Sequence, residues 1–327
     1  MGWRDAKIRS LAADLSRAEK ELADLRSGVD DLPSFAGYVY ADRRINAHLG
    51  ERNIPGRSNQ IARKLKGYSF AQSHGVRIPD LLGLWERPED IPWDDLPDHV
   101  VLKSHTGAAS RGVYPLRRID GRWVVVTRDE PIEPAEIVAR LTELLRDGHI
   151  GGPLFGQQLI GAGRDNALPT EVRVFGFYGE VGMVNVRRAT SHGDNAGTKV
   201  RRFLEDGTPG PRHPLHDDSI GLPDIFKEAV DIGRHFSTKV PRPFVRIDFL
   251  DDDGDVVFGE LTPRPGGPHY FGPTDDLRLG ELWERAQARV LNDVIDGSDY
   301  SLKFGEGPRE LAIGDRKYLP DQGWLAP

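Results

Sequence analysis

One stretch of the sequence limits the possible fold more than any other. Residues 244–267 read FVRIDFLDDDGDVVFGELTPRPGG, with apolar and polar residues alternating on both sides of an Asp253-Gly254 pair. Such a dipeptide between two alternating segments is a strong signal for an antiparallel hairpin. The pattern predicts strands over residues 244–250 and 256–261, joined by a loop of residues 251–255.

The predicted hairpin gathers charged side chains on one face. Side chains alternate between the faces of a strand, so Arg246 shares a face with Asp248, and Glu260 shares a face with Thr262. The predicted loop places Arg246 opposite Glu260, with Asp248 one diagonal step away, roughly 7–8 Å between Cα atoms. Two carboxylates at that separation can hold a hard cation such as Mg²⁺ between them.

Two other interpretations of the hairpin compete with a magnesium site. The first is an ordinary hairpin with a solvated acidic face. The second is a calcium loop, since Asp251, Asp253, Gly254 and Glu260 match positions of the EF-hand pattern. That pattern requires flanking helices and places Phe249 at the first ligand position, so we consider it a poor match.

Composition limits the class of protein. A chain of 327 residues has room for two domains or for one large two-lobed domain. Its net charge of −7 argues against a broad nucleic-acid surface. We expect no membrane span and no signal peptide, hence a cytoplasmic protein, because long apolar runs are missing. The sequence contains no cysteine, which excludes disulfides, thiolate catalysis and cysteine metal sites.

The N-terminal part carries one clear helix signal. Residues 5–27 have apolar side chains at heptad spacing and predict an amphipathic helix. This helix either packs on its own body or forms a dimer or partner contact. Residues 34–57 predict irregular structure, and residues 59–73 predict a second helix that ends before Gly75.

A second cluster with chemical potential follows. His99–Ser104 predicts a buried strand with Lys103 near its end, followed by a loop of small residues, Thr106–Val113, and a hairpin over 113–127. Small residues let backbone N–H groups approach phosphate oxygens, and the lysine supplies a positive charge. The segment is neither a Walker A loop nor a dinucleotide fingerprint. It predicts either a phosphate-binding loop or a flexible surface hairpin.

The remaining segments predict alternating helices and strands. We expect helices over 134–147, 223–237 and 280–296, a strand over 153–160, and a hairpin over 171–188. A basic cluster begins at the end of this hairpin and includes Lys199, Arg201 and Arg202. It predicts either a solvated loop or a segment that covers an anion such as a triphosphate. The tail after Tyr300 has few signals and is expected to wrap the surface.

Four of these segments together resemble a known family. They are YSFAQSHGVRIPDLLGLWERPEDI, LPDHVVLKSHTG, EVRVFGFYGEV and the hairpin sequence, and their order resembles the ATP-grasp superfamily, in particular its TupA-like branch associated with teichuronopeptide synthesis. The resemblance covers about residues 58–295. It implies an α+β fold with two α/β lobes whose antiparallel sheets clasp ATP, preceded by an N-terminal helix. The implied divisions are 1–57 (helical segment), 58–155 (first lobe), 156–298 (second lobe) and 299–327 (tail).

The resemblance also implies a role for each matching residue. Those expected to contact ATP are Lys64, Lys103, Gly107, Ser110, Gly112, the hinge residues Gln157, Gln158, Leu159 and Ile160, and Asp165 at the ribose. Those expected to bind Mg²⁺ are Asp248, Glu260 and Thr262. Those expected to act on the phosphates or the substrate are Lys199, Arg201, Arg246 and Arg264. The sequence departs from the superfamily at Gln157, where an acid is usual, and at Thr262, where asparagine is usual.

The implied activity is an ATP- and Mg²⁺-dependent ligation of a carboxylate to an amine through an acyl phosphate. The carboxylate and amine would belong to a cell-envelope polymer or to a small peptide. Two alternatives stay open. One is a kinase on the same fold that phosphorylates an alcohol, and the other is a non-catalytic nucleotide-binding protein that docks through its N-terminal helix.

Overall fold

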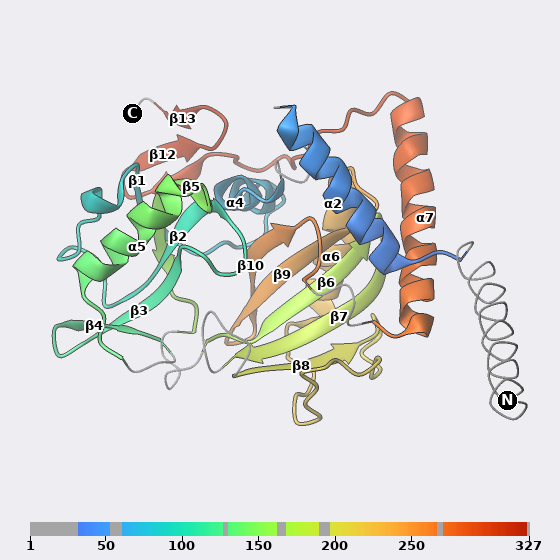
Figure 1. Cartoon of the computed structure of the whole chain (residues 1–327), viewed down its shortest axis with the longest axis horizontal. Helices are drawn as coiled ribbons and strands as arrows, with labels where there is room; N and C mark the ends of the chain where they lie inside the picture. The colour runs from blue at the N-terminus through green and yellow to red at the C-terminus, as the bar shows by residue number, and fades with distance from the viewer. Residues whose placement is uncertain are drawn as a thin grey trace, which may run out of the picture.

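Two β-sheets with helices around them account for most of the chain (Figure 1). The computed structural model describes residues 32–52, 61–126, 130–161, 168–189, 197–266 and 271–325. The helix predicted over residues 5–27 and the site residue Asp165 lie outside these ranges. Among the described helices, none combines the length and the apolar character that a bilayer-spanning helix needs.

The first sheet has eight strands in the order β13-β12-β11-β1-β5-β2-β3-β4. Its strands are β1 (Leu81–Trp85), β2 (His99–Gly107), β3 (Val113–Ile119), β4 (Arg122–Val125), β5 (Ile150–Gln158), β11 (Leu311–Ile313), β12 (Arg316–Leu319) and β13 (Gly323–Trp324). A short 3₁₀ turn, η1 (Pro88–Asp90), and helix α5 (Pro134–Arg146) accompany it. The predicted hairpin over 113–127 is present as β3 and β4, which turn at Asp120 and Gly121 with φ values of 47° and 77°.

The second sheet is antiparallel, with five strands in the order β10-β9-β6-β7-β8. Its strands are β6 (Glu171–Phe177), β7 (Glu180–Ala189), β8 (Thr198–Phe203), β9 (Val245–Asp252) and β10 (Asp255–Thr262). Four helices complete the fold: α2 (Phe35–Glu51), α4 (Lys64–Ser73), α6 (Phe226–Lys239) and α7 (Pro273–Ile295). Figure 1 places α4 where the two sheets meet and α7 at the far side of the second sheet.

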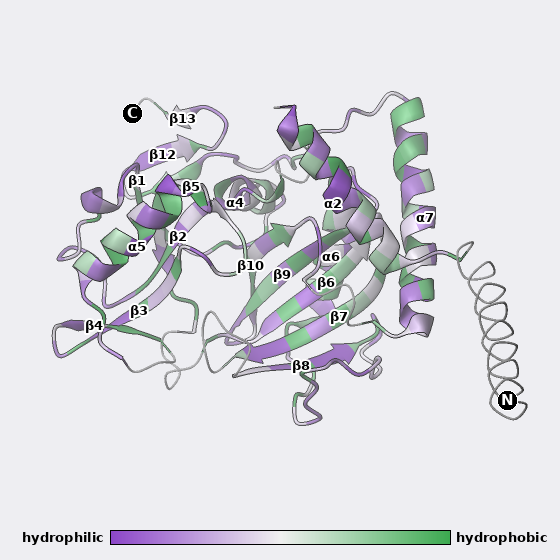
Figure 2. Ribbon diagram, in the orientation of Figure 1, coloured by the Kyte–Doolittle hydropathy of each residue, from purple (hydrophilic) through white to green (hydrophobic). Residues whose placement is uncertain are grey.

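The two faces of the second sheet differ in chemistry. One face carries buried apolar residues, among them Val174, Ile247 and Phe249, which belong to one core with residues of α6. The strands alternate between hydrophobic and hydrophilic residues along their length (Figure 2). The opposite face therefore presents the polar residues of the same strands. One end of the sheet is closed by α2 and α7, where the Phe35 ring lies 5.2 Å from Phe244.

Two predictions about irregular regions were wrong. Residues 35–51 form helix α2, which is capped by Ser34, whose Oγ accepts a hydrogen bond from the Gly37 N–H at 3.0 Å. Only Phe35 and Val39 are buried along it, so the sequence carries little helical periodicity. The C-terminal tail does not wrap the surface. It adds β11, β12 and β13 to the first sheet, as strands too short to leave a clear alternation.

The predicted hairpin is present as β9 and β10, with a tighter turn than expected. Asp253 and Gly254 both have positive φ values, 56° and 96°, as a two-residue hairpin turn with the twist of the strands requires. Further along, the register shifts by one residue between Phe258 and Glu260, so Gly259 forms a bulge. Without this shift residue 259 would pair with Asp248, and Glu260 would point to the other face.

We expect the bulge to require glycine. A Cβ atom at Gly259 would lie 2.9 Å from the backbone oxygen of Asp248, a contact that forces the two strands apart. Gly259→Ala should therefore lower the free energy of unfolding by about 1–3 kcal/mol. Urea denaturation would measure the loss, with Gly221→Ala as the control because nothing lies within 4 Å of a Cβ there. Equal unfolding midpoints for the two variants would show that the bulge tolerates a side chain.

Candidate active site

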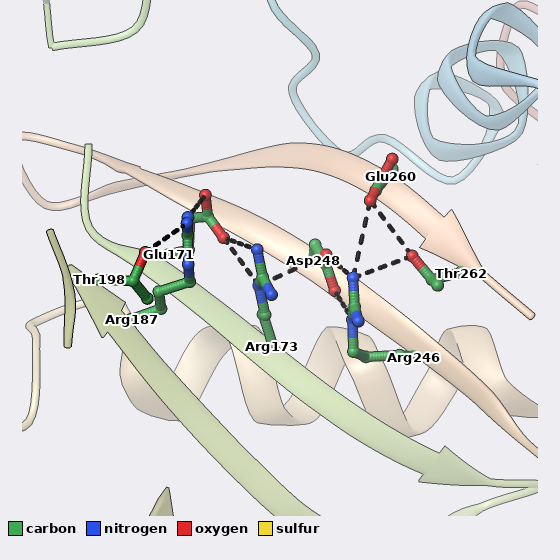
Figure 3. A network of polar contacts seen from close by, with 8 residues as sticks. All are labelled: Glu171, Arg173, Arg187, Thr198, Arg246, Asp248, Glu260 and Thr262. Carbon is green, nitrogen blue, oxygen red and sulfur yellow. Dashed lines mark hydrogen bonds and ion pairs between the residues drawn. The ribbon is translucent and has the colours of Figure 1, made fainter. Parts of the chain in front are cut away.

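The centre of the site is the pair of carboxylates on the β9–β10 hairpin. Glu260 lies directly opposite Asp248, and Thr262 lies opposite Arg246 (Figure 3). The expected register, with Arg246 opposite Glu260, is therefore wrong. The two-residue turn and the bulge at Gly259 together cause the difference. In the observed register the carboxylates of Asp248 and Glu260 lie closer together than in the diagonal arrangement that the sequence predicted.

Arg246 lies between these groups. Its Nε and Nη2 donate to the two carboxylate oxygens of Asp248, each at 2.6 Å. The same Nη2 donates to Thr262 Oγ1 at 3.1 Å and lies 3.6 Å from Glu260 Oε1. Arg246 and Asp248 are buried, whereas the side chain of Glu260 is 42% exposed. One guanidinium therefore contacts every oxygen-bearing side chain of the predicted metal site.

The charged contacts continue across the sheet (Figure 3). Arg173 Nε lies 3.6 Å from Asp248 Oδ2 and donates to Glu171 Oε2 at 2.7 Å. Arg187 donates to Glu171 Oε1 at 2.7 Å and to Thr198 Oγ1 at 3.0 Å. The side chains alternate in charge from Glu260 on β10 to Arg187 on β7, so each partly buried charge has a neighbour of opposite sign. Unpaired, such charges would cost several kcal/mol each to bury.

The carboxylates of Asp248 and Glu171 respond differently to this environment. Burial raises the pKa of Asp248, although the guanidinium groups of Arg246 and Arg173 act in the opposite direction. Burial also acts to raise the pKa of Glu171, but Arg173 and Arg187 outweigh it and hold that pKa below its ordinary value.

The hairpin fits a magnesium ion that arrives with a phosphate ligand. No cluster of three acidic, histidine or cysteine side chains suited to a metal occurs among the residues that the structure describes. Mg²⁺ commonly takes only one or two carboxylates and completes its shell with water and substrate phosphates. Asp248, Glu260 and Thr262 supply oxygen donors of this kind. A cation bound there competes with Arg246 for the same oxygens.

Two lysines approach this site from the first sheet and from α4. Lys64 begins α4, whereas Lys103 lies in the middle of β2, because this strand continues to Gly107 and is longer than the predicted strand His99–Ser104. Burial lowers the pKa of both, in Lys103 to about 8, while the charge of Glu260 acts in the opposite direction on each. Glu260 of one sheet is thus within electrostatic reach of both lysines, and the site joins the two lobes.

The loop of small residues connects to the same cluster. Lys64 Nζ donates to the carbonyl oxygen of Gly107 at 3.4 Å. Gly107 and Gly112 have positive φ values of 143° and 68°, and Ser110 has a φ of 59°. A Cβ at Gly112 would lie 2.9 Å from Ser104 Oγ, so the tight path of this loop favours glycine there. Phosphate binding by the loop stays a prediction.

The residues predicted for the hinge lie at the end of β5. Gln157 is 1% exposed, and its side-chain oxygen accepts a hydrogen bond from the hydroxyl of Tyr68. The Gln158 N–H donates to the carbonyl oxygen of Asp80 at 2.8 Å, so this group is engaged within the protein. Residues 159–160 are buried beyond the strand end. Adenine contacts by this segment stay a prediction.

Two predicted phosphate ligands lie away from the carboxylates. Residues 198–203 form strand β8 and not a loop, and its pairing with β7 places Arg202 on the face of Asp248. Lys199 and Arg201 therefore point to the opposite face. Arg201 Nη1 donates to the carbonyl oxygens of Asp218 and Ile220 at 2.8 and 2.9 Å. The strand periodicity thus separates these two residues from the carboxylates, and their contact with phosphates stays a prediction.

Arg264, predicted to bind a substrate carboxylate, contacts an acid of the protein itself. Its Nη1 lies 3.5 Å from Asp42 Oδ2 on α2, and Arg242 donates to the other oxygen of Asp42 at 2.9 Å. The side chain of Arg264 is 31% exposed. A role for Arg264 toward substrate stays a prediction.

Sequence reasoning missed several residues of the site. Glu171 and Arg173 alternate with valines in a predicted strand, a pattern that could have shown them to share one face. Arg202 was expected as part of the basic cluster, and the same alternation could have placed it on this face once residues 198–203 were taken as a strand. Tyr68 lies on a predicted helix, and nothing local in the sequence distinguishes it from a core residue.

One family model matches the part of the chain that carries the hairpin. A family model described as TupA-like ATPgrasp matches residues 160–284, the part that holds Asp248 and Glu260. These residues form a TupA-like ATP-grasp domain. No curated protein matches the sequence.

Several solved structures are similar at low identity. D-alanine–D-alanine ligase from Bacillus anthracis is 16% identical over 76% of each chain, with a TM-score of 0.47. The same enzyme from Coxiella burnetii is 13% identical over 80% of this chain and 69% of that one, with a TM-score of 0.43. A RiPP-associated ATP-grasp ligase from Chryseobacterium gregarium, in complex with ADP and with leader and core peptide, is 16% identical over 76% and 64%, with a TM-score of 0.35.

The lowered pKa of Lys103 gives a pH-dependent prediction for the nucleotide-free protein. The unfolded chain keeps the proton on this lysine up to a pH of about 10.5, whereas the folded chain releases it near pH 8. The unfolded state therefore binds more protons in this window, and this lysine makes the free energy of unfolding rise with pH across it. Below pH 8 the buried ammonium costs stability.

Lys103→Met should consequently be more stable than the wild type at pH 7.5, by roughly 2–3 kcal/mol. The difference should shrink as the pH approaches 10. Urea denaturation of both proteins at several pH values measures this difference in the free energy of unfolding. Only the difference between the wild type and Lys103→Met, not the pH dependence of either protein alone, reports on Lys103. A gap that does not change with pH would show that the ammonium is not desolvated.

Proposed function

We propose that the protein is an ATP- and Mg²⁺-dependent carboxylate–amine ligase that forms an amide through an acyl phosphate. One observation carries the proposal most directly. Glu260, paired with Asp248 on one sheet, lies within electrostatic reach of the buried Lys64 and the partly buried Lys103, supplied by the other lobe. Carboxylates for a hard cation and ammonium groups for phosphates then lie within electrostatic reach of one another, which suits a metal-bound triphosphate.

The proposed chemistry explains why so many charges are needed. A carboxylate is a poor acylating agent because its leaving group would be oxide. When a carboxylate oxygen attacks the γ-phosphorus, the bond from phosphorus to the ADP oxygen breaks and an acyl phosphate forms. An amine then attacks the acyl carbon, inorganic phosphate leaves, and the amine loses a proton. Phosphoryl transfer of this kind depends mainly on positioning and on charge stabilisation.

Each residue of the site has a proposed part in this reaction. Asp248, Glu260 and Thr262 would hold the Mg²⁺ ion, which when bound neutralises phosphate charge. Lys64 and Lys103 bind and orient the phosphates. Arg246, whose Nε and Nη2 donate to Asp248, would face the transferred phosphoryl group and stabilise its charge.

The distant ligase neighbours and the TupA-like match favour ligation over the kinase alternative within the ATP-grasp family. The TupA-like branch points further to substrates of the cell envelope or to small peptides. A kinase and a ligase need the same metal and the same lysines, so these residues do not distinguish the two activities. The two activities differ in the chemistry of the group that accepts the phosphoryl group. The test must therefore examine the product and not the nucleotide alone.

A hydroxylamine trap distinguishes the reaction types. A library of acids and amines is first screened for ADP release, and hydroxylamine then replaces the amine with the active acid. We expect a hydroxamate together with ADP and phosphate. Asp248→Asn and Glu260→Gln should each lower turnover by ~10²-fold or more, equivalent to about 2.7 kcal/mol of transition-state stabilisation.

Asp255→Asn is the matched control, because this acid lies on the same hairpin with a side chain that is 77% exposed. It should turn over as the wild type does. Formation of ADP with a stable phosphate ester, and of no hydroxamate, would establish the kinase alternative and remove the ligase proposal. Full activity of either metal-ligand variant would remove the assignment of these carboxylates.

A further inference from the structure

A chain of buried hydrogen bonds leads to Lys103 from behind the site. Lys103 Nζ donates to the hydroxyl oxygen of Tyr68 at 3.2 Å, and the hydroxyl of Tyr68 donates to Oε1 of Gln157. Tyr68 and Gln157 are 0% and 1% exposed. Because the oxygen of Tyr68 accepts from the lysine, its single proton is directed to Gln157. The direction of both hydrogen bonds is therefore set.

The Tyr68 ring is held by both lobes. It packs edge-on against Phe155 of β5 and against Phe258 of β10, each with a centroid distance of 6.1 Å. Phe155 belongs to the first sheet and Phe258 to the second, so the ring lies where the two sheets meet. A ring fixed in this way gives its hydroxyl a fixed position. Lysine, by contrast, has a flexible four-carbon stem that needs an anchor to point its charge.

The partner of Lys103 is a neutral group. Among the residues that the structure describes, no carboxylate forms an ion pair with this lysine, and the acids that influence it, Glu260 and Glu171, act at longer range. Burial raises the pKa of Tyr68 well above its ordinary value, so the hydroxyl keeps its proton. Gln157, at the end of the chain of bonds, carries no charge either. An acid at either position would pair with the ammonium and compete with a phosphate for it.

We propose that Tyr68 is a positioning residue for Lys103, and that Gln157 orients Tyr68, so that the ammonium is aimed at the nucleotide phosphates without a competing counterion. The inference rests on the proposed function only in taking Lys103 as a phosphate ligand. It assigns Gln157 a role in the first lobe, in place of a contact with adenine.

A double-mutant cycle tests the proposal. Binding of a non-hydrolysable ATP analogue with Mg²⁺ is measured for the wild type, Tyr68→Phe, Lys103→Met and the double variant, by calorimetry and, for weak binding, by ligand-observed NMR. Phenylalanine keeps the ring in its place between Phe155 and Phe258. We expect Tyr68→Phe to lower the affinity roughly tenfold in the wild type and to have no effect once Lys103 is methionine.

Tyr114→Phe is the control. Tyr114 lies on β3, in the sheet that carries Lys103, but its hydroxyl interacts with Arg140. It should leave the affinity unchanged. Gln157→Met approaches the chain of bonds from its other end and should also weaken binding only while Lys103 is present. This variant keeps the proposal testable if Tyr68→Phe does not fold.

The other outcomes overturn the proposal. Unchanged affinity in Tyr68→Phe would mean that the hydroxyl does not position the lysine. Equal losses with and without Lys103 would mean that Tyr68 supports the fold or contacts the nucleotide by itself. A wild type that binds no nucleotide would instead remove the proposed function, so failure of the two ideas can be distinguished.

Discussion

The pairing of β9 with β10 is the constraint on which the site depends. A one-residue register shift at Gly259 moves Glu260 to the face of Asp248, and Thr262 to the face of Arg246. A strand has a side-chain period of two, so a ladder without the bulge would send these pairs to opposite faces. A single backbone irregularity thus brings together the side chains of the proposed cation site.

The rest of the polar face follows from the need to bury charge. Asp248 is 4% exposed and is stable there because Arg246 and Arg173 approach it from two strands. Arg173 in turn shares Glu171 with Arg187. Such a network loses stability when one member is removed and leaves an uncompensated charge. It also holds the guanidinium groups close to the position at which a phosphate and its metal would add further charge.

The sequence was most informative where the alternation of side chains is strong. It predicted the hairpins, the helices α5 and α6, and the strand that carries Lys103, because their periodicity or turn residues are local. It could not predict the register of β9 and β10, since the bulge depends on a close approach of Gly259 to the backbone of Asp248. It misplaced Lys199 and Arg201 because residues 198–203 were not seen as a strand. Tyr68 was missed because its partners, Lys103 and Gln157, are 35 and 89 residues away in sequence.

The central claim is that the β9–β10 carboxylates and the two lysines form one site for a metal-bound nucleotide. A crystal structure with Mn²⁺ and a non-hydrolysable ATP analogue tests it most directly, because anomalous scattering locates the manganese ion. The account predicts an ion within about 2.5 Å of oxygens from both Asp248 and Glu260, with phosphates at Lys64 and Lys103. An ion or nucleotide bound elsewhere, with Arg246 still paired to Asp248, would contradict it.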